Sequence, residues 1–493
     1  MTEFSLATAA MLSPPAVWRH FAALCALPRP SKGEGRVREH LLTWAAARGL
    51  ATETDTVGNL LIRKPASPGC AGAPGVVLQA HLDMVCQCNA DVVHDFNVDP
   101  IVPVLRDGWL VAERTTLGAD NGIGVALILA ALEDASLVHG PLEALLTVDE
   151  ESGMGGARGL APGWLRGTLL LNLDTEDWGQ FYVGCAGGID VSLRRVGQAE
   201  PLPEGHLGGR VVVRGLRGGH SGVDIHEGRG HAIKLLIRLL RQIERRWPLR
   251  LSALSGGTAR NALPREAFAD IALPTAAWAE IDAFLAGWQA IFRAELAGVD
   301  AGVTLAWAPV TPASVMCTAD QNAWLGGLHA APQGIRRMSV GVPGVVETSG
   351  NLGVVALMPS GGQANFMLRS LVDSATADLA EEIVSLATLA GLTAECSGAY
   401  PGWRPNPASP LLARCQARFA ATFGEVSSVQ VIHAGLECGL IGGTYPSLDM
   451  VSFGPTIRGA HAPGEAVEVD SVARCWRLLT AILSDLAGRA ADA

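Results

Sequence analysis

The stretch Gly75-Val-Val-Leu-Gln-Ala-His81-Leu-Asp83 is a short apolar run that ends in a histidine and a carboxylate. Buried strands of an open α/β sheet read as short apolar runs, and ligands bind beyond their carboxyl ends. Two further runs have the same form, Leu142-Glu-Ala-Leu-Leu-Thr-Val-Asp149-Glu150-Glu151 and Thr168-Leu-Leu-Leu-Asn-Leu-Asp174. The three runs therefore predict strands of one sheet whose ends aim a histidine and several carboxylates at a single crevice.

A fourth segment adds a carboxylate at the start of a predicted helix. In Thr115-Thr-Leu-Gly-Ala-Asp120-Asn-Gly122, Asp120 stands where a loop turns into a helix that we expect to run through Glu133. A pair of divalent cations in a hydrolytic site needs hard oxygen donors and imidazole, with at least one carboxylate shared between the ions. Asp120 is the natural bridge, because its place at a helix start leaves both carboxylate oxygens free. The four segments together predict a two-metal site.

Two carboxylates are left over beside the expected ligands. Asp83 lies two residues from His81, on the same side of a strand, where it could hydrogen-bond the imidazole and fix its tautomer. Glu150 and Glu151 suggest a division of labour, in which one ligates and its neighbour takes a proton from water. Taken singly, such polar residues also occur simply because turns begin where strands end. The adjacent glutamates are harder to explain as mere turn residues, since like charges side by side cost energy without a cation.

The composition limits the classes of function. The chain has 493 residues, 49% hydrophobic and 17% charged, which predicts a well-packed protein of two or more domains. Its net charge of −11 argues against a nucleic-acid or anionic-membrane partner. No apolar stretch reaches the roughly 20 residues of a membrane-spanning helix, and the N-terminus lacks the cationic start of a signal peptide. Ten cysteines without a C-x-x-C pair suit a reducing compartment, so we expect a cytoplasmic protein.

The order of the predicted elements indicates two domains, one of them interrupted. Through residue 190, helices and strands alternate, which favours an α/β domain with a mixed, largely parallel sheet covered by helices. Residues 191–397 instead predict an inserted α+β domain with helices on one face of its sheet. After the Pro-rich joint at 401–407 the α/β pattern resumes. We therefore predict a discontinuous domain, 1–190 and 398–493, that carries the metal site.

Six sequence blocks resemble those of a known family. They are Gln79-Ala-His81-Leu-Asp83-Met-Val85, Thr116-Leu-Gly-Ala-Asp120-Asn-Gly122, Asp149-Glu150-Glu151-Ser-Gly153, Asn172-Leu-Asp174, Gly218-Gly-His220-Ser-Gly222 and Gly459-Ala-His461-Ala-Pro463. On these motifs the chain resembles the zinc-dependent family of aminoacylases, carboxypeptidases and dipeptidases. Three further blocks, Asn261–Glu266, Gly398–Trp403 and His433–Gly439, narrow the resemblance to its dipeptidases. The resemblance runs in order from near Trp18 to the C-terminal helix.

The resemblance implies a role for each residue of the metal site. His81 and Asp174 would ligate one ion, Glu151 and His461 the other, and Asp120 would bridge both. Asp83 would orient His81, and Glu150 would be the general base. Two divalent ions per subunit are therefore expected. Zn²⁺ is expected first, and Co²⁺ or Mn²⁺ also suit this ligand set.

The family also implies the reaction and its remaining residues. We expect hydrolysis of dipeptides with free amino and carboxyl ends, with broad specificity that includes dipeptides ending in histidine. Hydroxide formed from water between the ions would attack the peptide carbonyl, with Glu150 accepting the proton and His220 donating to the oxyanion. Arg369 and Asn261 are candidates for binding the C-terminal carboxylate, and Glu437 for binding the free amine. The inserted domain would act as a lid and as the pairing surface of a homodimer.

Other functions remain open at this stage. An N-acyl-amino-acid deacylase or an aminotripeptidase of the same family is the nearest alternative. A non-catalytic metal-binding scaffold is an alternative of another class, although it would be expected to lack Glu150 or a ligand. A two-metal phosphoesterase is disfavoured, because only Arg114 and Arg458 adjoin the ligand blocks and a phosphoryl group needs more positive charge.

Overall fold

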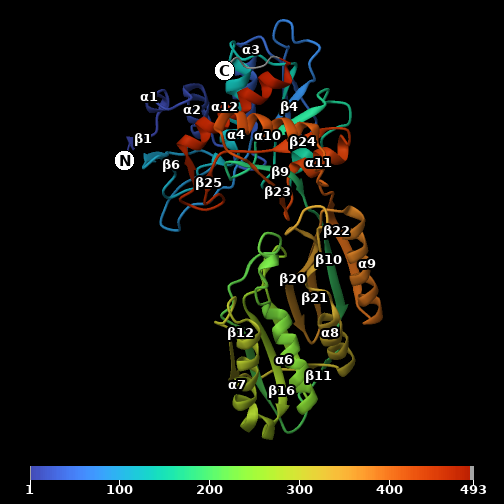
Figure 1. Cartoon of the computed structure of the whole chain (residues 1–493). Helices are drawn as coiled ribbons and strands as arrows, with labels where there is room; N and C mark the ends of the chain where they lie inside the picture. Colours follow the sequence, from blue (N-terminus) through green and yellow to red (C-terminus); the bar gives the residue numbers. More distant parts are fainter. Residues whose placement is uncertain (1, 489–493) are drawn as a thin grey trace. The chain divides into compact units, whose positions relative to one another are not determined.

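The computed structural model describes residues 2–488, which form two compact units (Figure 1). The first unit consists of Met1–Gly184, Pro405–Val431 and Leu436–Ala493, and the second of Cys185–Arg404 and Ile432–Gly435. The sequence analysis placed its boundaries at 190/191 and 397/398, and it did not foresee that 432–435 belong to the second unit.

The first unit is built on an eight-stranded sheet. Its strands, in spatial order, are β2 (Ala51–Thr54), β3 (Leu60–Lys64), β7 (Leu142–Thr147), β4 (Val76–His81), β8 (Leu169–Asn172), β24 (Asp449–Ser452), β9 (Gln180–Cys185) and β23 (Ser428–Ile432). The central strands β7, β4, β8 and β24 are parallel, whereas β3 and β9 pair antiparallel with this group. The sheet is thus mixed and largely parallel, as predicted.

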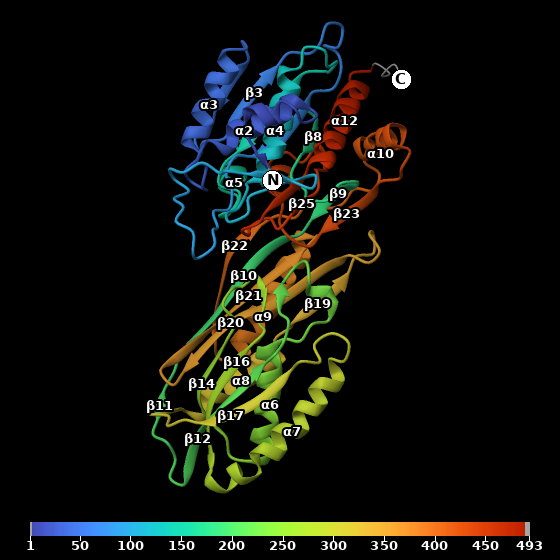
Figure 2. The ribbon, with the colours of Figure 1, turned by 90° about the vertical axis from the view of Figure 1, so that its left-hand side faces the viewer.

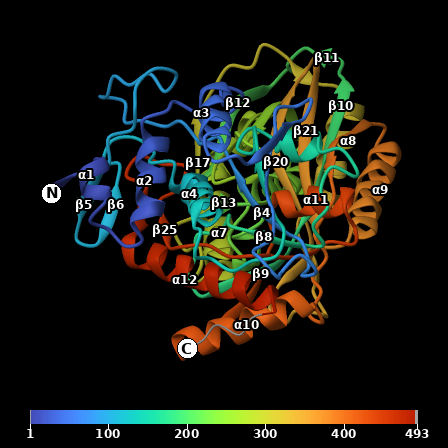
Figure 3. The ribbon, with the colours of Figure 1, turned by 90° about the horizontal axis from the view of Figure 1, so that it is seen from above.

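Helices cover this sheet and bury its apolar strands. They are α1 (Leu6–Ala9), α2 (Pro15–Cys25), α3 (Gly35–Ala46), α4 (Ala119–Glu133), α5 (Gly155–Arg158), α10 (Pro410–Phe423), α11 (Glu437–Thr444) and α12 (Val469–Leu486). Helix α4 packs on β4, and Figure 3 shows α2 and α12 beside it. Almost every residue of α4 is buried, because the helix is apolar on all sides.

A smaller antiparallel sheet in the same unit brings the two ends of the chain together. It contains β1 (Thr2–Glu3), β5 (Val104–Arg106), β6 (Trp109–Val111), β26 (Ala466–Glu468) and β25 (Ile457–Arg458). The pairing of β26 with β6 holds the C-terminal loop 459–465 next to the segment that precedes α4. His461 and Asp120, which are far apart in sequence, lie close together as a result.

The second unit is an antiparallel sheet with helices against it. Its strand order is β17 (Thr304–Pro309), β12 (His206–Arg214), β16 (Ala267–Pro274), β14 (Arg250–Gly256), β20 (Val346–Met358), β21 (Gly361–Ser370), β10 (Gly187–Val196) and β22 (Thr393–Tyr400), with β19 (Gly334–Met338) paired to β20. Figure 2 shows β20, β21 and β10 running side by side. Along β12 the buried residues alternate with exposed ones, the pattern of a sheet covered on one face.

Four helices supply the cover of this sheet. They are α6 (Ala232–Arg246), α7 (Trp278–Glu295), α8 (Thr318–Ala330) and α9 (Asp373–Leu389), whose apolar side chains form one core with the strands. Helix α8 was not predicted, since Gly326 and Gly327 lie within it and weaken its helix propensity, although the helix runs through them without a break. Within residues 2–488, none of the helices combines the length and apolar character needed to cross a membrane.

His231 is a buried histidine that caps the start of α6. Its Nδ1 accepts the N–H of Lys234 at 3.3 Å, and its Nε2 donates to the carbonyl of Leu352 at 3.0 Å. Burial, with a smaller contribution from the charge of Lys234, lowers the pKa of this imidazole from 6.5 to about 3. The unfolded chain therefore binds a proton between these two pH values that the folded chain does not.

We predict that the free energy of unfolding falls as the pH is lowered from 6.5 toward 3, and that this dependence is weaker in His231→Asn. One such proton corresponds to a slope of at most about 1.4 kcal/mol per pH unit. Asparagine keeps a helix-capping acceptor but does not titrate. Urea unfolding of both proteins, followed by circular dichroism at several pH values, measures the two slopes. Equal slopes would contradict the assignment.

Candidate metal centre

Three parallel strands deliver the predicted ligands to one edge of the first sheet. His81 is the last residue of β4, Glu150 and Glu151 follow β7, and Asp174 follows β8. Since β7, β4 and β8 are adjacent and parallel, their carboxyl ends lie at the same edge, where ligands of α/β sheets bind. The structure therefore brings these residues together from three separate parts of the sequence.

Asp120 reaches the same edge from the start of α4. The preceding Gly118 has φ +69°, a left-handed conformation that favours glycine, and Asp120 itself departs from helical geometry. Asn121 donates from Nδ2 to the carbonyl of Leu173 at 2.8 Å. This bond ties the first turn of α4 to the residue beside Asp174, so that the carboxylates of Asp120 and Asp174 face one space.

The predicted ligands form two clusters that share Asp120. In one, ligand atoms of His81, Asp120 and Asp174 lie within 4.8 Å of one another, and in the other those of Asp120, Glu151 and His461 do. His81 Nε2 is 3.0 Å from Asp120 Oδ1 and 3.4 Å from Asp174 Oδ1. His461 Nε2 is 3.3 Å from Asp120 Oδ2 and 3.2 Å from Glu151 Oε2. Each oxygen of Asp120 thus faces a different histidine.

The pKa values of the clustered side chains are shifted by burial and by the carboxylates around them. Burial and nearby carboxylates raise the pKa values of Glu151 and Asp174 above their usual range. Although burial opposes it, the carboxylates of Asp174 and Asp120 raise the pKa of His81, and contacts with Asp120 and Glu151 raise that of His461 to about 11. Asp120 is the exception among these acids: although burial opposes it, the contacts with His461 and His81 lower the pKa of its carboxyl group.

The donor set and its unused atoms fit divalent metal ions. The five residues offer three carboxylates and two imidazoles, the ligand types of zinc and related ions. Glu151 Oε1 is buried and has no hydrogen-bond partner among the described residues. A buried carboxylate oxygen without a partner is costly, and a metal ion would satisfy it. These observations support His81, Asp120, Glu151, Asp174 and His461 as the metal-binding residues.

Asp83 is fully buried behind the ligands and makes more contacts than the sequence indicated. Its Oδ1 lies 3.5 Å from His81 Nδ1, while its own backbone carbonyl lies closer, at 3.2 Å. Its carboxylate also accepts the backbone N–H groups of Glu150, at 3.0 Å, and Glu151, at 3.1 Å. Although burial opposes it, these contacts lower the pKa of Asp83 to about 2. One anionic side chain therefore orients both the imidazole and the glutamate pair.

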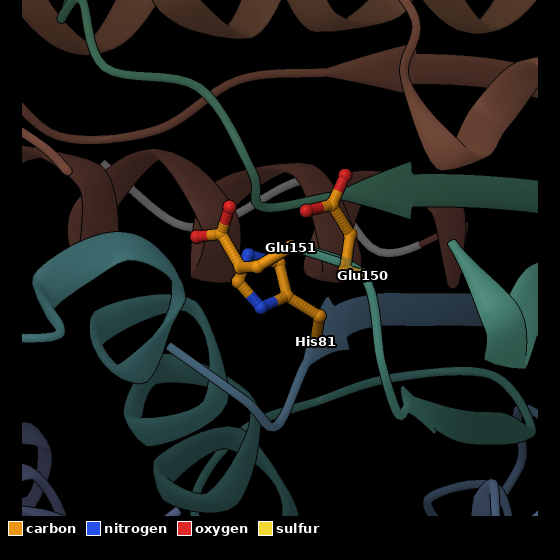
Figure 4. Close-up of side chains that lie close together, drawn as sticks. All are labelled: His81, Glu150 and Glu151. Carbon is orange, nitrogen blue, oxygen red and sulfur yellow. The ribbon is translucent and has the colours of Figure 1, made fainter. Parts of the chain in front are cut away.

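Glu150 lies beside the clusters rather than within the two that share Asp120. It forms a third group with His81 and Glu151, whose candidate ligand atoms lie within 4.8 Å of one another. Figure 4 shows the two glutamate carboxylates on different sides of the His81 ring. Burial, together with the charges of Asp174, Glu437 and Glu151, raises the pKa of Glu150 well above its usual value. A carboxylate that readily accepts a proton next to a metal site suits a general base.

Glu437, the predicted partner of a substrate amine, is buried at the start of α11. Its Oε2 accepts hydrogen bonds from Gln79 Nε2 and Thr147 Oγ1, each at 2.6 Å. Its Oε1 is buried and has no partner among residues 2–488. Burial raises the pKa of Glu437 to about 7. The side chain thus links β4 and β7 directly beneath the ends that carry His81 and Glu150.

The second unit gathers a different group of predicted residues. Arg369 is buried on β21, donates to the hydroxyl of Tyr400 at 2.9 Å, and has an unpartnered Nε. His220 ends the short strand β13 (Gly219–His220), which pairs with β15 (Ala262–Leu263), and burial and the charge of Arg369 lower the pKa of its imidazole to about 4. Asn261 is exposed, and its backbone carbonyl accepts the N–H of Ser221 at 2.8 Å.

The sequence analysis did not single out His433, which belongs to the same group. It is buried, with Nε2 at 2.8 Å from Ser349 Oγ and with Nδ1 unpartnered. Burial, Arg369 and His220 together lower its pKa to about 3. A neutral histidine and a buried guanidinium with unused N–H groups form a surrounding suited to an anion. The block His433–Gly439 was the available indication, but no spacing rule connects it with Arg369.

Arg29 and Glu465 were also missed as residues near the metal centre. Both are buried, and both hydrogen-bond backbone groups of the ligand-bearing segments. The turn Pro28-Arg29-Pro30 and the position of Glu465 four residues after His461 were visible in the sequence. A charged residue between two prolines, or near a ligand, does not by itself indicate which backbone groups it will reach.

Two clusters of carboxylates and histidines that share one aspartate, at the edge of an α/β sheet, form a candidate site for two metal ions, an arrangement used by metal-dependent hydrolases. Residues 77–485 match the model of Peptidase family M20/M25/M40. The chain is 44% identical over 476 residues to the cytosol non-specific dipeptidase of Escherichia coli K12, covering 96% of this chain and 98% of that one. It therefore belongs to this peptidase family and is a peptide hydrolase, in agreement with the resemblance drawn from its motifs.

Solved structures support the same assignment of the fold. The aminoacylhistidine dipeptidase of Vibrio alginolyticus matches with a TM-score of 0.89 and 44% identity, covering 97% of each chain. The aminopeptidase PepT of Bacillus cereus matches with a TM-score of 0.55 and 17% identity, over 97% of this chain and 100% of that one. The second match concerns the fold alone. Members of the family depend on metal ions, and the clusters above provide candidate sites.

We predict that Zn²⁺ stabilises the chelator-treated protein and that Asp120→Asn removes most of this effect. An ion that binds only the folded chain raises the free energy of unfolding by about 2.7 kcal/mol at 100 times its dissociation constant. Loss of Asp120 removes a ligand from both clusters at once. Thermal melting of the two proteins with and without Zn²⁺ measures the difference. If Zn²⁺ raised the melting temperature of both proteins equally, Asp120 would be excluded as a ligand.

Proposed function

We propose that this peptide hydrolase is a two-metal dipeptidase that cleaves dipeptides with free amino and carboxyl ends. The observation that carries the proposal is the placement of Asp120, whose two oxygens face His81 and His461 separately. The names of the relatives from E. coli and V. alginolyticus, each 44% identical, support dipeptides as the substrate class. A cytosolic location and pairing of two copies through the second unit are parts of the same proposal.

His81 and Asp174 would hold one ion, Glu151 and His461 the second, and Asp120 both. Zn²⁺ is the expected metal, and Co²⁺ and Mn²⁺ also suit these ligands. When bound, such ions polarise the peptide carbonyl and bring the pKa of water from 15.7 to roughly 7. The protein must then accept the proton of that water, deliver it to the leaving amine and stabilise the oxyanion.

Glu150 is suited to both proton transfers. It lies beside the clusters, and burial favours the neutral form of its carboxyl group, so it is placed to accept a proton from water and return it to the leaving nitrogen. Asp83 supports this role, because it holds the backbone N–H groups of Glu150 and Glu151 while it contacts His81. The base and the ligands are thus fixed by one buried carboxylate.

His220 is the proposed donor to the oxyanion. Its Nδ1 accepts the backbone N–H groups of Gly222, at 3.3 Å, and Val223, at 3.0 Å. The neutral ring must therefore carry its proton on Nε2, which is left to donate. The low pKa of the imidazole keeps it in this neutral form at neutral pH.

The remaining proposed residues would bind the two charged ends of the dipeptide. We propose that Arg369 binds the C-terminal carboxylate, with Asn261 as a further contact and His433 as a neighbour that remains neutral. Arg369 has an unused Nε, and a guanidinium can bind a carboxylate through two N–H groups. Glu437, with its unpartnered Oε1, is the proposed partner of the free amine.

We predict that Glu150→Gln lowers kcat by about 10²–10⁴-fold while leaving the metal content at two ions per chain. Glutamine keeps the shape of the side chain but cannot accept the proton. Turnover of a dipeptide and metal content by mass spectrometry measure the two effects separately. Retained turnover would show that another residue is the base.

We predict that free dipeptides are hydrolysed in preference to N-acetyl amino acids and tripeptides. The alternatives within the family, a deacylase or an aminotripeptidase, predict the opposite order. The values of kcat/KM for glycyl-histidine, β-alanyl-histidine, N-acetyl-histidine and a tripeptide, measured on one metal-loaded preparation, decide between them. Faster cleavage of either of the last two would overturn the substrate assignment.

We predict that Arg369→Gln raises KM for a dipeptide about tenfold or more. The KM for the corresponding dipeptide amide should change much less. The amide lacks the carboxylate that Arg369 is proposed to bind. Arg194→Gln, at an exposed arginine of β10 in the same sheet, is the control and should leave both KM values unchanged. Equal effects of Arg369→Gln on both substrates would exclude carboxylate recognition.

A further inference from the structure

The segments that carry the metal-site residues are joined by two buried charged side chains from opposite ends of the sequence. Arg29 precedes α3 and Glu465 precedes β26, and each is only 2% exposed. Within residues 2–488 neither side chain lies within ion-pair distance of an opposite charge. Both instead direct their hydrogen bonds to backbone groups around Asp120. Burying charges in this way is expensive, so the bonds they form need an explanation.

Glu465 binds the loop that leads into Asp120. Its Oε2 accepts the N–H groups of Leu117 and Gly118, at 2.7 and 2.9 Å. Its Oε1 accepts those of Ala119 and Asp120, at 2.8 and 3.2 Å. Four successive N–H groups therefore surround one carboxylate. Because Glu465 follows His461 by four residues, these bonds fix the loop of His461 against the backbone of Asp120.

Arg29 binds a backbone carbonyl of the same loop and two carbonyls just after the end of β4. One guanidinium nitrogen donates to the carbonyls of Leu82, at 3.0 Å, and Asp83, at 2.9 Å, and the other donates to Gly118 at 2.5 Å. Gly118 thus gives its N–H to Glu465 and its carbonyl to Arg29. A Cβ at Gly118 would collide with the Arg29 guanidinium, which adds a second reason for glycine beside its positive φ. Arg29 therefore joins the segment of His81 to the segment of Asp120.

We propose that Arg29 and Glu465 are positioning residues of the metal centre, which hold Asp120 within reach of His81 and His461 at the same time. This inference rests on the proposed two-metal function. A bridging carboxylate is useful only if both of its oxygens stay aimed at different ions, and a loop alone would not hold it so. Arg29 fixes it relative to β4, and Glu465 fixes it relative to the C-terminal loop.

A purely structural role is the competing explanation, and Glu143 allows a matched comparison. Glu143 lies near the beginning of β7, away from the strand ends that carry the ligands, and is 4% exposed. Its Oε2 accepts the N–H groups of Arg166 and Gly167 at 2.7 and 2.8 Å. It resembles Glu465 in type, burial and backbone hydrogen bonding, although its Oε1 also pairs with Arg63 Nε at 2.9 Å. Its backbone partners precede β8, at the opposite end of that strand from Asp174. Glu143→Gln thus reports the cost of losing a buried carboxylate as such.

The test is calorimetric titration of Zn²⁺ into the chelator-treated full chain, for the parent, Glu465→Gln and Glu143→Gln. We expect Glu465→Gln to bind Zn²⁺ about 10–100-fold more weakly, as is typical when a group that orients metal ligands is lost. Glu143→Gln should stay within about twofold of the parent, since its hydrogen bonds lie at the ends of β7 and β8 that are far from the ligands. With saturating Zn²⁺, Glu465→Gln should lower kcat for a dipeptide and leave KM nearly unchanged. Equal Zn²⁺ affinities of the two variants would overturn the proposal.

Arg29→Lys provides a second test, which also covers a failure of Glu465→Gln to fold. Lysine keeps the positive charge, but its single nitrogen cannot span the carbonyls of Leu82, Asp83 and Gly118 as two guanidinium nitrogens do. Zn²⁺ affinity should again fall about tenfold or more. An unchanged affinity in a folded Arg29→Lys would refute the role of Arg29. If the parent itself bound fewer than two Zn²⁺ or cleaved no dipeptide, the proposed function would fail, independently of these variants.

Discussion

Like charges held together at the edge of one sheet are the constraint on which the first unit depends. The order β7, β4, β8 brings Glu151, His81 and Asp174 to one place, and α4 adds Asp120. Burial and the neighbouring charge of Asp120 raise the pKa values of Glu151 and Asp174, and the carboxylates of Asp120 and Glu151 raise that of His461. Buried groups of this kind need support from the surrounding backbone, and a bound metal ion would neutralise them. The buried hydrogen bonds of Asp83, Arg29 and Glu465 provide that support.

The groups of predicted site residues in the two units carry opposite charges. The first unit presents carboxylates, which suit cations, and places a carboxylate of raised pKa beside them. The second unit presents Arg369 with His220 and His433, and the charge of the arginine helps to keep both imidazoles neutral. A dipeptide has an anionic C-terminal end and a peptide bond whose carbonyl must be polarised for hydrolysis. Under the proposed function, the carboxylates would hold the ions and Arg369 would bind the anionic end of the dipeptide.

Much of the fold and of the metal centre could be predicted from local sequence, because short apolar runs followed by polar residues mark the ends of parallel strands. His81, Glu151 and Asp174 were found in this way, and Asp120 from the loop-to-helix transition. His461 required family motifs, since its loop sits between two strands of two and three residues that carry no periodic pattern. Glu465, Arg29 and His433 could not be predicted, because their partners are backbone groups or side chains that only the folded chain brings near. Helix α8 was missed because its glycines obscure its helical pattern.

The spread of the ligands along the sequence has a consequence for how the protein is made. His81 is reached early in synthesis, whereas His461 and Glu465 come after the entire second unit and only about thirty residues before the end. A growing chain therefore carries the cluster of His81, Asp120 and Asp174 long before it can complete the cluster of Asp120, Glu151 and His461. A nascent or truncated chain lacks the means to assemble both clusters. Under the proposed function, a chain that stops before His461 would lack one ligand of the second cluster and would be expected to be inactive.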